Sequence, residues 1–271
     1  MIEGEDFKKE LVIEMRRLAL VAGRQIMTIY TSDEFGVSYK SDLSPVTEAD
    51  KLADAIISKG LGQKFPEIPL VTEEQASSHA ACYRTFLIVD PLDGTKEFVN
   101  RRDEFTVNIA FVENGIPKLG VVYAPALEKI YYTESTLEAK EEIAPFDEKK
   151  TGPSRLLRVA QSDNDALVVV ASKSHRDSAT DEYISRYKVT GFKSMGSSLK
   201  FCLLASGEAD LYPRLGRTME WDTAAGDALL RAAGGQVVNF DSQQPLIYGK
   251  LKYENPQFIA FSGNFRLKSD L

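Results

Sequence analysis

The sequence predicts an α+β arrangement in the first half of the chain and an α/β arrangement in the second half. Three observations support this: two helical patterns open the chain, closely spaced apolar runs follow up to residue 133, and strands alternate with helices after residue 155. The 271 residues are enough for one large domain or for two smaller domains that share a core.

Two helices open the first half. Residues 7–30 carry apolar side chains three and four positions apart, which indicates an amphipathic helix. A second helix begins near Thr47 and ends near Gly60. Short apolar runs then predict four strands, with a turn at Asn114-Gly115 between the second and the third. The strands are expected at residues 84–90, 105–112, 119–123 and 129–133.

A charged segment at residues 134–155 separates the two halves. It also contains Pro145, Gly152 and Pro153. We therefore interpret it as a surface excursion and as the junction of two domains. The predicted domains are residues 1–150, an α+β unit, and residues 151–271, an α/β unit.

Strands and helices alternate in the second half. Gly207 ends one of the predicted helices, and the pair Gly234-Gly235 is a strong stop signal for the last one. Strands are expected at residues 166–171, near 192, at 236–240 and at 258–262, and helices at 181–187, 198–205 and 223–233.

The composition limits the partners and the compartment. A net charge of -7 and a pI near 5.1 give no long-range attraction to a nucleic acid polymer or an anionic membrane. Residues 1–10 are polar and acidic, unlike a secretory signal, and the longest aliphatic run, 166–171, is too short to span a bilayer. Cys82 and Cys202 are expected to stay reduced. We predict a cytoplasmic protein, although peripheral membrane attachment is left open.

Several mechanisms are excluded by what the chain lacks. His79 and His175 are its only histidines, so a histidine-rich zinc site is not expected. The chain has no G-x-S-x-G elbow, no G-x-x-x-x-G-K-[ST] loop and no G-x-G-x-x-G turn. Serine hydrolases, P-loop NTPases and simple Rossmann enzymes are therefore poor matches.

The most informative segment is residues 90–95, with the sequence DPLDGT. Asp90 closes an apolar strand, Pro91 prevents the strand from continuing, and Gly94 permits a tight turn into a helix. Such a turn brings two carboxylates and the Leu92 carbonyl toward one point. Hard oxygen ligands suit Mg²⁺, and free amides at a helix start can hold a phosphate oxygen. The alternative is an Asp-Gly turn with a capping aspartate.

Two further acidic segments favour the metal site. Glu73 and Glu74 follow an apolar stretch and present carboxylates where a strand ends. Asp222 stands directly before an alanine-rich helix. The simpler interpretations are a solvated loop for the first pair and an N-cap for Asp222. An aspartate that caps a helix can still direct an oxygen at a metal.

Residues 47–50, with the sequence TEAD, resemble a capping box, and helix capping is their default meaning. A catalytic meaning requires Asp50 to reach the hydroxyl of Thr95. A threonine polarised in this way can accept a proton from the attacking water.

The motifs together resemble the inositol monophosphatase superfamily. The segments PVTEAD, TEE, DPLDGTKEF, GSSLKF and EWDTAAGDALLRAAGG occur in the same order, over almost the whole chain. Within the superfamily, TKEF, GSSLKF and ADLYPR are most similar to 3'(2'),5'-bisphosphate nucleotidases. Inositol monophosphatases more usually read DGTTNF, so Lys96-Glu97 departs toward the nucleotidases. The resemblance implies a layered αβαβα sandwich of the sugar-phosphatase type.

The resemblance also implies roles for individual residues. Asp50 and Thr95, assisted by Glu73, form the water-activating group. Two or three Mg²⁺ ions are bound by Glu73, Asp90, Asp93, Asp222 and the carbonyl of Leu92. Substrate is contacted by Asp93, Gly94, Thr95, Lys96, His175, Ser197, Lys200, Arg214 and Asp222. The first domain thus carries most metal ligands, and the second carries Asp222 and substrate contacts.

The implied activity is removal of the 3'-phosphate of adenosine 3',5'-bisphosphate (PAP) to give AMP and phosphate, with its sulfated relative PAPS as a further substrate. PAP is a by-product of sulfate assimilation, and inhibition by Li⁺ is expected. One alternative is an inositol monophosphatase or another phosphatase that acts on fructose bisphosphate or NADP. An alternative of another class is a non-catalytic nucleotide- or metal-binding protein. The partner is a small phosphorylated metabolite, and the chain is a monomer or a homodimer.

Overall fold

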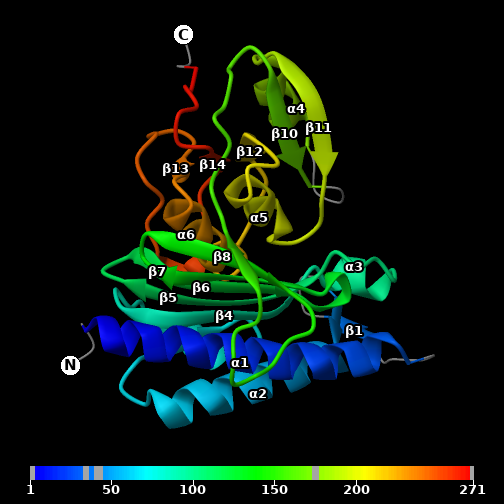
Figure 1. The fold of residues 1–271 in the computed structure, drawn as a ribbon, viewed down its shortest axis with the longest axis vertical. Helices are drawn as coiled ribbons and strands as arrows, with labels where there is room; N and C mark the ends of the chain where they lie inside the picture. Colours follow the sequence, from blue (N-terminus) through cyan, green and yellow to red (C-terminus); the bar gives the residue numbers. More distant parts are fainter. Residues whose placement is uncertain (1–3, 33–36, 40–44, 173–176, 269–271) are drawn as a thin grey trace.

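The computed structural model describes residues 4–32, 37–39, 45–172 and 177–268, and its elements stack in five layers (Figure 1). Helices α1 (Glu5–Tyr30) and α2 (Glu48–Lys64) cover one face of a seven-stranded sheet. Helices α5 (Leu199–Ala205) and α6 (Ala224–Ala232) lie between this sheet and a five-stranded sheet. Helix α4 (Ser178–Ser185) covers the far face of the smaller sheet. This αβαβα layering confirms the predicted fold class.

The larger sheet has the strand order β3-β4-β5-β6-β7-β8-β9. The first pair, β3 and β4, is parallel, and every later pair is antiparallel. The strands are β3 (Leu70–Thr72), β4 (Phe86–Asp93), β5 (Thr106–Glu113), β6 (Ile116–Ala124), β7 (Lys129–Ser135), β8 (Glu138–Ile143) and β9 (Ser154–Leu156).

The smaller sheet has the order β11-β10-β12-β14-β13 and is mixed. Its pairs β11-β10 and β10-β12 are parallel, whereas β12-β14 and β14-β13 are antiparallel. The strands are β10 (Leu167–Ala171), β11 (Val189–Ser194), β12 (Leu211–Arg214), β13 (Gln236–Asn239) and β14 (Phe258–Phe261). A separate antiparallel pair joins β1 (Val37–Tyr39) to β2 (Pro45–Thr47). The remaining elements are α3 (Thr95–Val99) and the 3-10 helices η1 (Ala76–Ala80), η2 (Pro125–Leu127) and η3 (Leu251–Tyr253).

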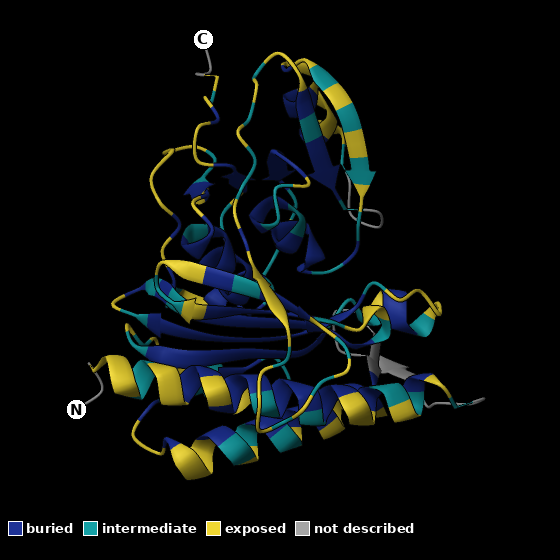
Figure 2. Ribbon diagram, viewed as in Figure 1, coloured by how far each residue is buried: buried dark blue, intermediate teal, exposed yellow. Residues whose placement is uncertain are grey.

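Both faces of the larger sheet are buried. In Figure 2 the central strands β4, β5 and β6 are buried along most of their length, whereas α1 and α2 expose their outer faces. Helix α6 packs very close to the sheet at Gly120, where an added Cβ would stand 2.4 Å from the carbonyl oxygen of Ala225. The absence of a side chain at Gly120 therefore sets how close α6, and the segment before it, comes to the sheet.

The prediction of a surface excursion at residues 134–155 was wrong. The segment contains β8 and most of β9, at one edge of the larger sheet. The many charges made β8 look like a surface segment, but two of its glutamates are buried in ion pairs. Glu142 accepts two hydrogen bonds from Arg16, at 2.9 and 2.7 Å, and Glu141 contacts Arg155. The division of the chain at residue 150 stays a prediction.

The predicted turn at Asn114-Gly115 is present between β5 and β6. Cys82 and Cys202 are free thiols, as expected. Among the residues that the structure describes, no helix is long and apolar enough to cross a membrane.

Candidate active site

Glu73 and Asp90 meet because β3 and β4 are parallel neighbours. Thr72 pairs with Val89. The residues that follow them, Glu73 and Asp90, therefore lie side by side at the same end of the two strands. The Glu73 amide continues the pairing and donates to the Val89 carbonyl at 3.1 Å. Asp90 is buried, with 1% of its surface exposed. The strand end predicted for Glu73 is therefore present.

The chain does not leave the sheet at Pro91, which corrects the prediction for this residue. Strand β4 continues to Asp93, and the register with β5 shifts between Asp90 and Asp93. The irregularity accommodates the proline, which has no amide to donate. Gly94 then adopts a φ of 90°, a left-handed conformation that glycine tolerates, and α3 begins at Thr95 as predicted.

Asp93 is fixed by groups that the sequence did not identify. Its Oδ2 atom accepts a hydrogen bond from the Ser198 amide at 2.6 Å and from Asn108 Nδ2 at 3.2 Å. The Ser198 hydroxyl in turn donates to Asn108 Oδ1 at 2.7 Å. Ser198 lies in the GSSLKF motif beside the predicted Ser197, but Asn108 follows no motif. Only the pairing of β5 with β4 brings it to the site.

Asp222 does not cap α6, which excludes the simpler interpretation of this residue. The N-cap is Thr223, and no side chain caps the helix. The Asp222 carboxylate instead accepts a hydrogen bond from the Met219 amide at 2.8 Å, within its own turn. Asn255 supports this turn by donating to the Met219 carbonyl at 2.7 Å and to the Thr223 hydroxyl at 2.9 Å.

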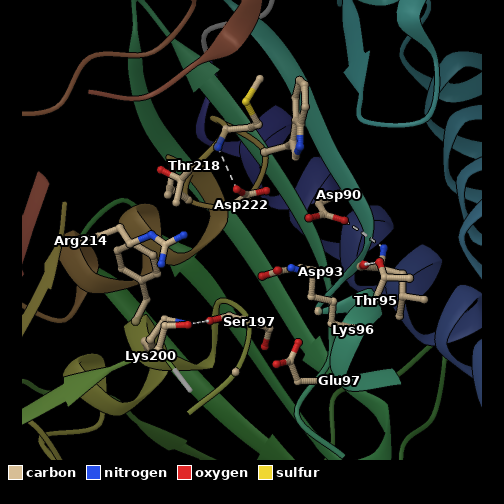
Figure 3. Close-up of a pocket in the computed structure, with 18 of the residues that line it drawn as sticks. Asp90, Asp93, Thr95, Lys96, Glu97, Ser197, Lys200, Arg214, Thr218 and Asp222 are labelled. Carbon is tan, nitrogen blue, oxygen red and sulfur yellow. Dashed lines mark hydrogen bonds between the residues drawn. The ribbon is translucent and has the colours of Figure 1, made fainter. Parts of the chain in front are cut away.

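One cavity of about 440 Å³ collects the acidic residues from all three segments. It is lined by Glu73, Asp90, Asp93 and Asp222, together with Leu92. Figure 3 shows Asp222 beside the turn that carries Asp90 and Asp93. The convergence on which the predicted metal site depends is therefore present in the fold.

The carboxylates oppose one another's ionisation. Burial raises the pKa of Asp93 to about 6, although the nearby Lys200 and the bonds from Asn108 and Ser198 act in the opposite direction. Burial also raises the pKa of Asp222 well above its usual range, and repulsion from Asp93 and Glu73 adds to the shift. These groups ionise together only with a compensating positive charge.

Thr95 and Asp50 make the contact that the catalytic interpretation requires. The Thr95 hydroxyl lies 3.2 Å from Asp50 Oδ1 and 3.1 Å from the Leu92 carbonyl oxygen. Asp50 also closes the predicted capping box, because its Oδ2 accepts the Thr47 amide at 2.7 Å and the Thr47 hydroxyl at 2.6 Å. The capping box is therefore confirmed, and the second oxygen of the same carboxylate makes the contact with Thr95 that a catalytic role requires.

A basic region faces the carboxylates across the cavity. Lys200 and Arg214 line the cavity there together with Ser197, whereas the exposed Lys96 lies beside Thr95, on the side of the carboxylates (Figure 3). Lys200 is buried, and burial lowers its pKa to about 8 although Asp93 favours the charged form. Its ammonium donates to the Met195 carbonyl at 3.3 Å. The predicted contact His175 lies outside the described residues.

The cavity contains further residues that sequence reasoning missed. The lining residues that were not predicted as site residues are Glu97, Ser172, Gly196, Phe201, Tyr212, Arg217, Thr218, Met219, Trp221 and Thr223. Four of them, from Arg217 to Trp221, precede Asp222, so nearness to the EWDT motif was the available signal.

The donor set fits Mg²⁺ rather than a softer metal. The candidate ligands are four carboxylates and a carbonyl, all oxygen donors, which Mg²⁺ prefers. Within the described part of the chain, no three carboxylate, thiol or imidazole groups already stand in a ligand arrangement. Three of the carboxylates use one oxygen for a backbone amide: Asp90 for Leu92, Asp93 for Ser198 and Asp222 for Met219.

Residues 8–265 match the model of the inositol monophosphatase family. This chain belongs to the inositol monophosphatase family. The match covers both sheets and all of the acidic segments described above. It confirms the resemblance that the motifs indicated.

Relatives from this family resemble the chain over nearly its full length. A 3'(2'),5'-bisphosphate nucleotidase CysQ from Buchnera aphidicola is 41% identical over 256 residues, which cover 93% of this chain and 91% of the relative. The protein of the same name from Escherichia coli K12 is 41% identical over 89% of this chain and 96% of its own length. The crystal structure of CysQ from Bacteroides thetaiotaomicron superposes with a TM-score of 0.82, at 36% identity, over 95% of this chain and 98% of that one.

Proposed function

We propose that this chain is a Mg²⁺-dependent 3'(2'),5'-bisphosphate nucleotidase that hydrolyses PAP to AMP and phosphate and also accepts PAPS. The observation that carries the proposal is the gathering of Glu73, Asp90, Asp93 and Asp222 around one cavity that also holds Lys200. The nucleotidase name of relatives at 41% identity supports the choice of substrate.

The proposed metal ligands are the four carboxylates and the Leu92 carbonyl, which hold two or three Mg²⁺ ions. When bound there, Mg²⁺ supplies positive charge for the phosphate and lowers the pKa of water. The carboxylates need this charge in any case, since burial and mutual repulsion raise the pKa of Asp93 and of Asp222. Members of the family are generally Mg²⁺-dependent phosphatases, which agrees with this assignment.

The water-activating group is Thr95 with Asp50, assisted by Glu73. Thr95 Oγ1 accepts a proton from the attacking water as its own proton moves to Asp50 Oδ1, 3.2 Å away. The resulting hydroxide forms a bond to phosphorus, and the bond from phosphorus to the 3'-oxygen breaks. The departing 3'-oxygen takes up a proton from solvent, Asp50 releases its proton to solvent, and no phosphorylated enzyme forms.

The remaining cavity residues position the substrate. The amides of Gly94 and Thr95 hold oxygens of the reacting phosphate, together with Lys96. Lys200 and Arg214 offer positive charge on the opposite wall, where the second phosphate of a bisphosphate needs it, and Ser197 lies beside Lys200. Asp93, Asp222 and His175 complete the proposed contacts.

The test is phosphate release with Mg²⁺ from PAP, PAPS and inositol 1-phosphate at equal concentration. We expect kcat/KM to be higher for PAP and PAPS than for inositol 1-phosphate, since only a substrate with two phosphates uses both walls of the cavity. A preference for inositol 1-phosphate would favour an inositol monophosphatase, and no release from any of the three would favour a binding protein. Titration with Li⁺ in the same assay tests the expected inhibition.

Three broader proposals accompany the activity. The substrate is a small phosphorylated metabolite, the chain works in the cytoplasm, and it is a monomer or a homodimer. Light scattering in solution decides the last point, and fractionation of cells decides the compartment.

A further inference from the structure

Helix η1 (Ala76–Ala80) connects two of the acidic segments through one side chain, His79. The imidazole Nε2 lies 2.7 Å from the Thr72 carbonyl oxygen and donates to it. The same ring stacks on Trp221, with the ring centroids 4.8 Å apart and the planes inclined by 23°. One imidazole therefore contacts segments that are about 150 positions apart in the sequence.

The two contacts fall next to candidate metal ligands. Thr72 precedes Glu73, and Trp221 precedes Asp222. His79 is not among the described residues that line the cavity, whereas Trp221 is. Any effect of the imidazole on the site is thus transmitted through its two neighbours.

A second residue, Tyr253, connects the same two regions of the chain. The buried Tyr253 donates from its hydroxyl to the Ala81 carbonyl at 2.7 Å, and its own carbonyl accepts the Glu220 amide at 2.8 Å. Its ring centroid lies 6.2 Å from that of His79 and 6.5 Å from that of Trp221. The chain after η1 is therefore tied to the Asp222 turn at two places.

Helix η1 is also anchored to the strand that it follows. The Ser78 hydroxyl accepts the Thr72 amide at 3.1 Å and donates to the Gln75 carbonyl at 2.7 Å. Gln75 Nε2 donates to Asp54 on α2 at 2.7 Å. These bonds hold η1 in a fixed position relative to Thr72. A displacement of the His79 ring would therefore also displace the end of β3.

We propose that His79 is a positioning residue that holds the segments of Glu73 and Asp222 where both carboxylates can bind Mg²⁺. The inference rests on the proposed function, because it assumes the metal site. Its physical basis is that the two carboxylates line the same cavity, where like charges repel each other unless a cation binds. A stacked ring that is also hydrogen-bonded resists this repulsion, and groups that orient metal ligands commonly contribute 10- to 100-fold in metal affinity.

The test compares Mg²⁺ binding by three variants, measured by calorimetry without substrate. His79→Ala removes the stack and the hydrogen bond, and we expect it to weaken Mg²⁺ binding about tenfold. His79→Phe keeps a stacked ring but has no donor, so we expect a loss of roughly threefold. The control is Ser77→Ala, an exposed position in the same 3-10 helix, which should bind Mg²⁺ as the wild type does.

Kinetics provide the second measurement. At saturating Mg²⁺, kcat of His79→Ala should return close to the wild-type value, because the ligands themselves are intact. An unchanged Mg²⁺ affinity in His79→Ala, even with a lower melting temperature, would overturn the proposal. A wild type that binds Mg²⁺ but releases no phosphate from PAP would contradict the proposed function alone, since the comparison of affinities does not need the substrate.

Discussion

Three of the carboxylates that line the cavity accept hydrogen bonds from backbone amides. Asp93 accepts the Ser198 amide, Asp222 accepts the Met219 amide, and Asp90 accepts the Leu92 amide at 3.0 Å. Each side chain is thereby oriented by the backbone. Burial of such groups lowers stability unless their charge is met, which suits a site that is completed by a cation.

The first prediction concerns Asp93→Asn. The amide retains an oxygen for the Ser198 amide, so the fold should persist, but it lacks the charge that a divalent cation requires. We expect kcat/KM for PAP to fall at least a hundredfold while the far-UV circular dichroism spectrum is unchanged. Activity like that of the wild type would refute the assignment of Asp93 as a metal ligand.

The second prediction is a pH dependence in metal-free protein. Burial raises the pKa of Asp93 from 3.8 to about 6, so the folded state binds this proton more tightly than the unfolded state does. The resulting stabilisation is complete below about pH 4 and is lost as the pH rises toward 6. The free energy of unfolding of the wild type, relative to Asp93→Asn, should therefore fall across this window in urea titrations with a chelator. A difference that does not change with pH would contradict the shift.

At the scale of elements, close packing of α6 against β6 sets the position of the Asp222 turn. Gly120 allows the helix backbone to approach the sheet, and a Cβ there would lie 2.4 Å from the Ala225 carbonyl oxygen and 3.0 Å from its Cα atom. Both obstacles are backbone atoms, so the helix itself must move if a side chain is added. Gly120, which does not line the cavity, thus affects where the candidate metal ligand Asp222 lies.

The third prediction is that Gly120→Ala costs stability and metal affinity together. We expect the free energy of unfolding to fall by about 2 kcal/mol through overpacking, and Mg²⁺ binding to weaken as the Asp222 turn shifts. The control is Gly62→Ala on α2, where an added Cβ meets nothing within 4 Å, so the helix should gain about 0.5–1 kcal/mol. Urea unfolding and calorimetry measure both quantities. A Gly120→Ala protein as stable as Gly62→Ala would exclude this packing argument.

At the scale of the whole molecule, the sequence predicted the layers and the acidic cavity better than the supports around them. Strands and helices were recognisable because their periodicity is local, and DPLDGT with EWDTAAG identified the carboxylates. Strand β8 was missed because its charges are paired with Arg16 and Arg155, which lie elsewhere in the chain. Asn108 and His79 were missed for a related reason: their partners are set by strand pairing and tertiary packing, and neither residue belongs to a motif.

The last prediction follows from the way distant segments share one cavity. Glu73 and Asp93 belong to the larger sheet and its edge, whereas Asp222 precedes a helix between the sheets, so bound Mg²⁺ should tie these segments together. At a hundredfold excess over its dissociation constant, a ligand specific for the folded state adds about 2.7 kcal/mol to the free energy of unfolding.

For a chain of this size, we expect a chelator to lower the melting temperature by roughly 5 °C relative to saturating Mg²⁺. Hydrogen exchange should speed up at residues 72–73 and at residues 219–223 together, because loss of the bound Mg²⁺ frees both segments. The same treatment should leave exchange in α4, on the far face of the smaller sheet, unchanged. Faster exchange in only one of the two acidic segments would contradict a metal site to which both contribute ligands, since removal of the metal then exposes both.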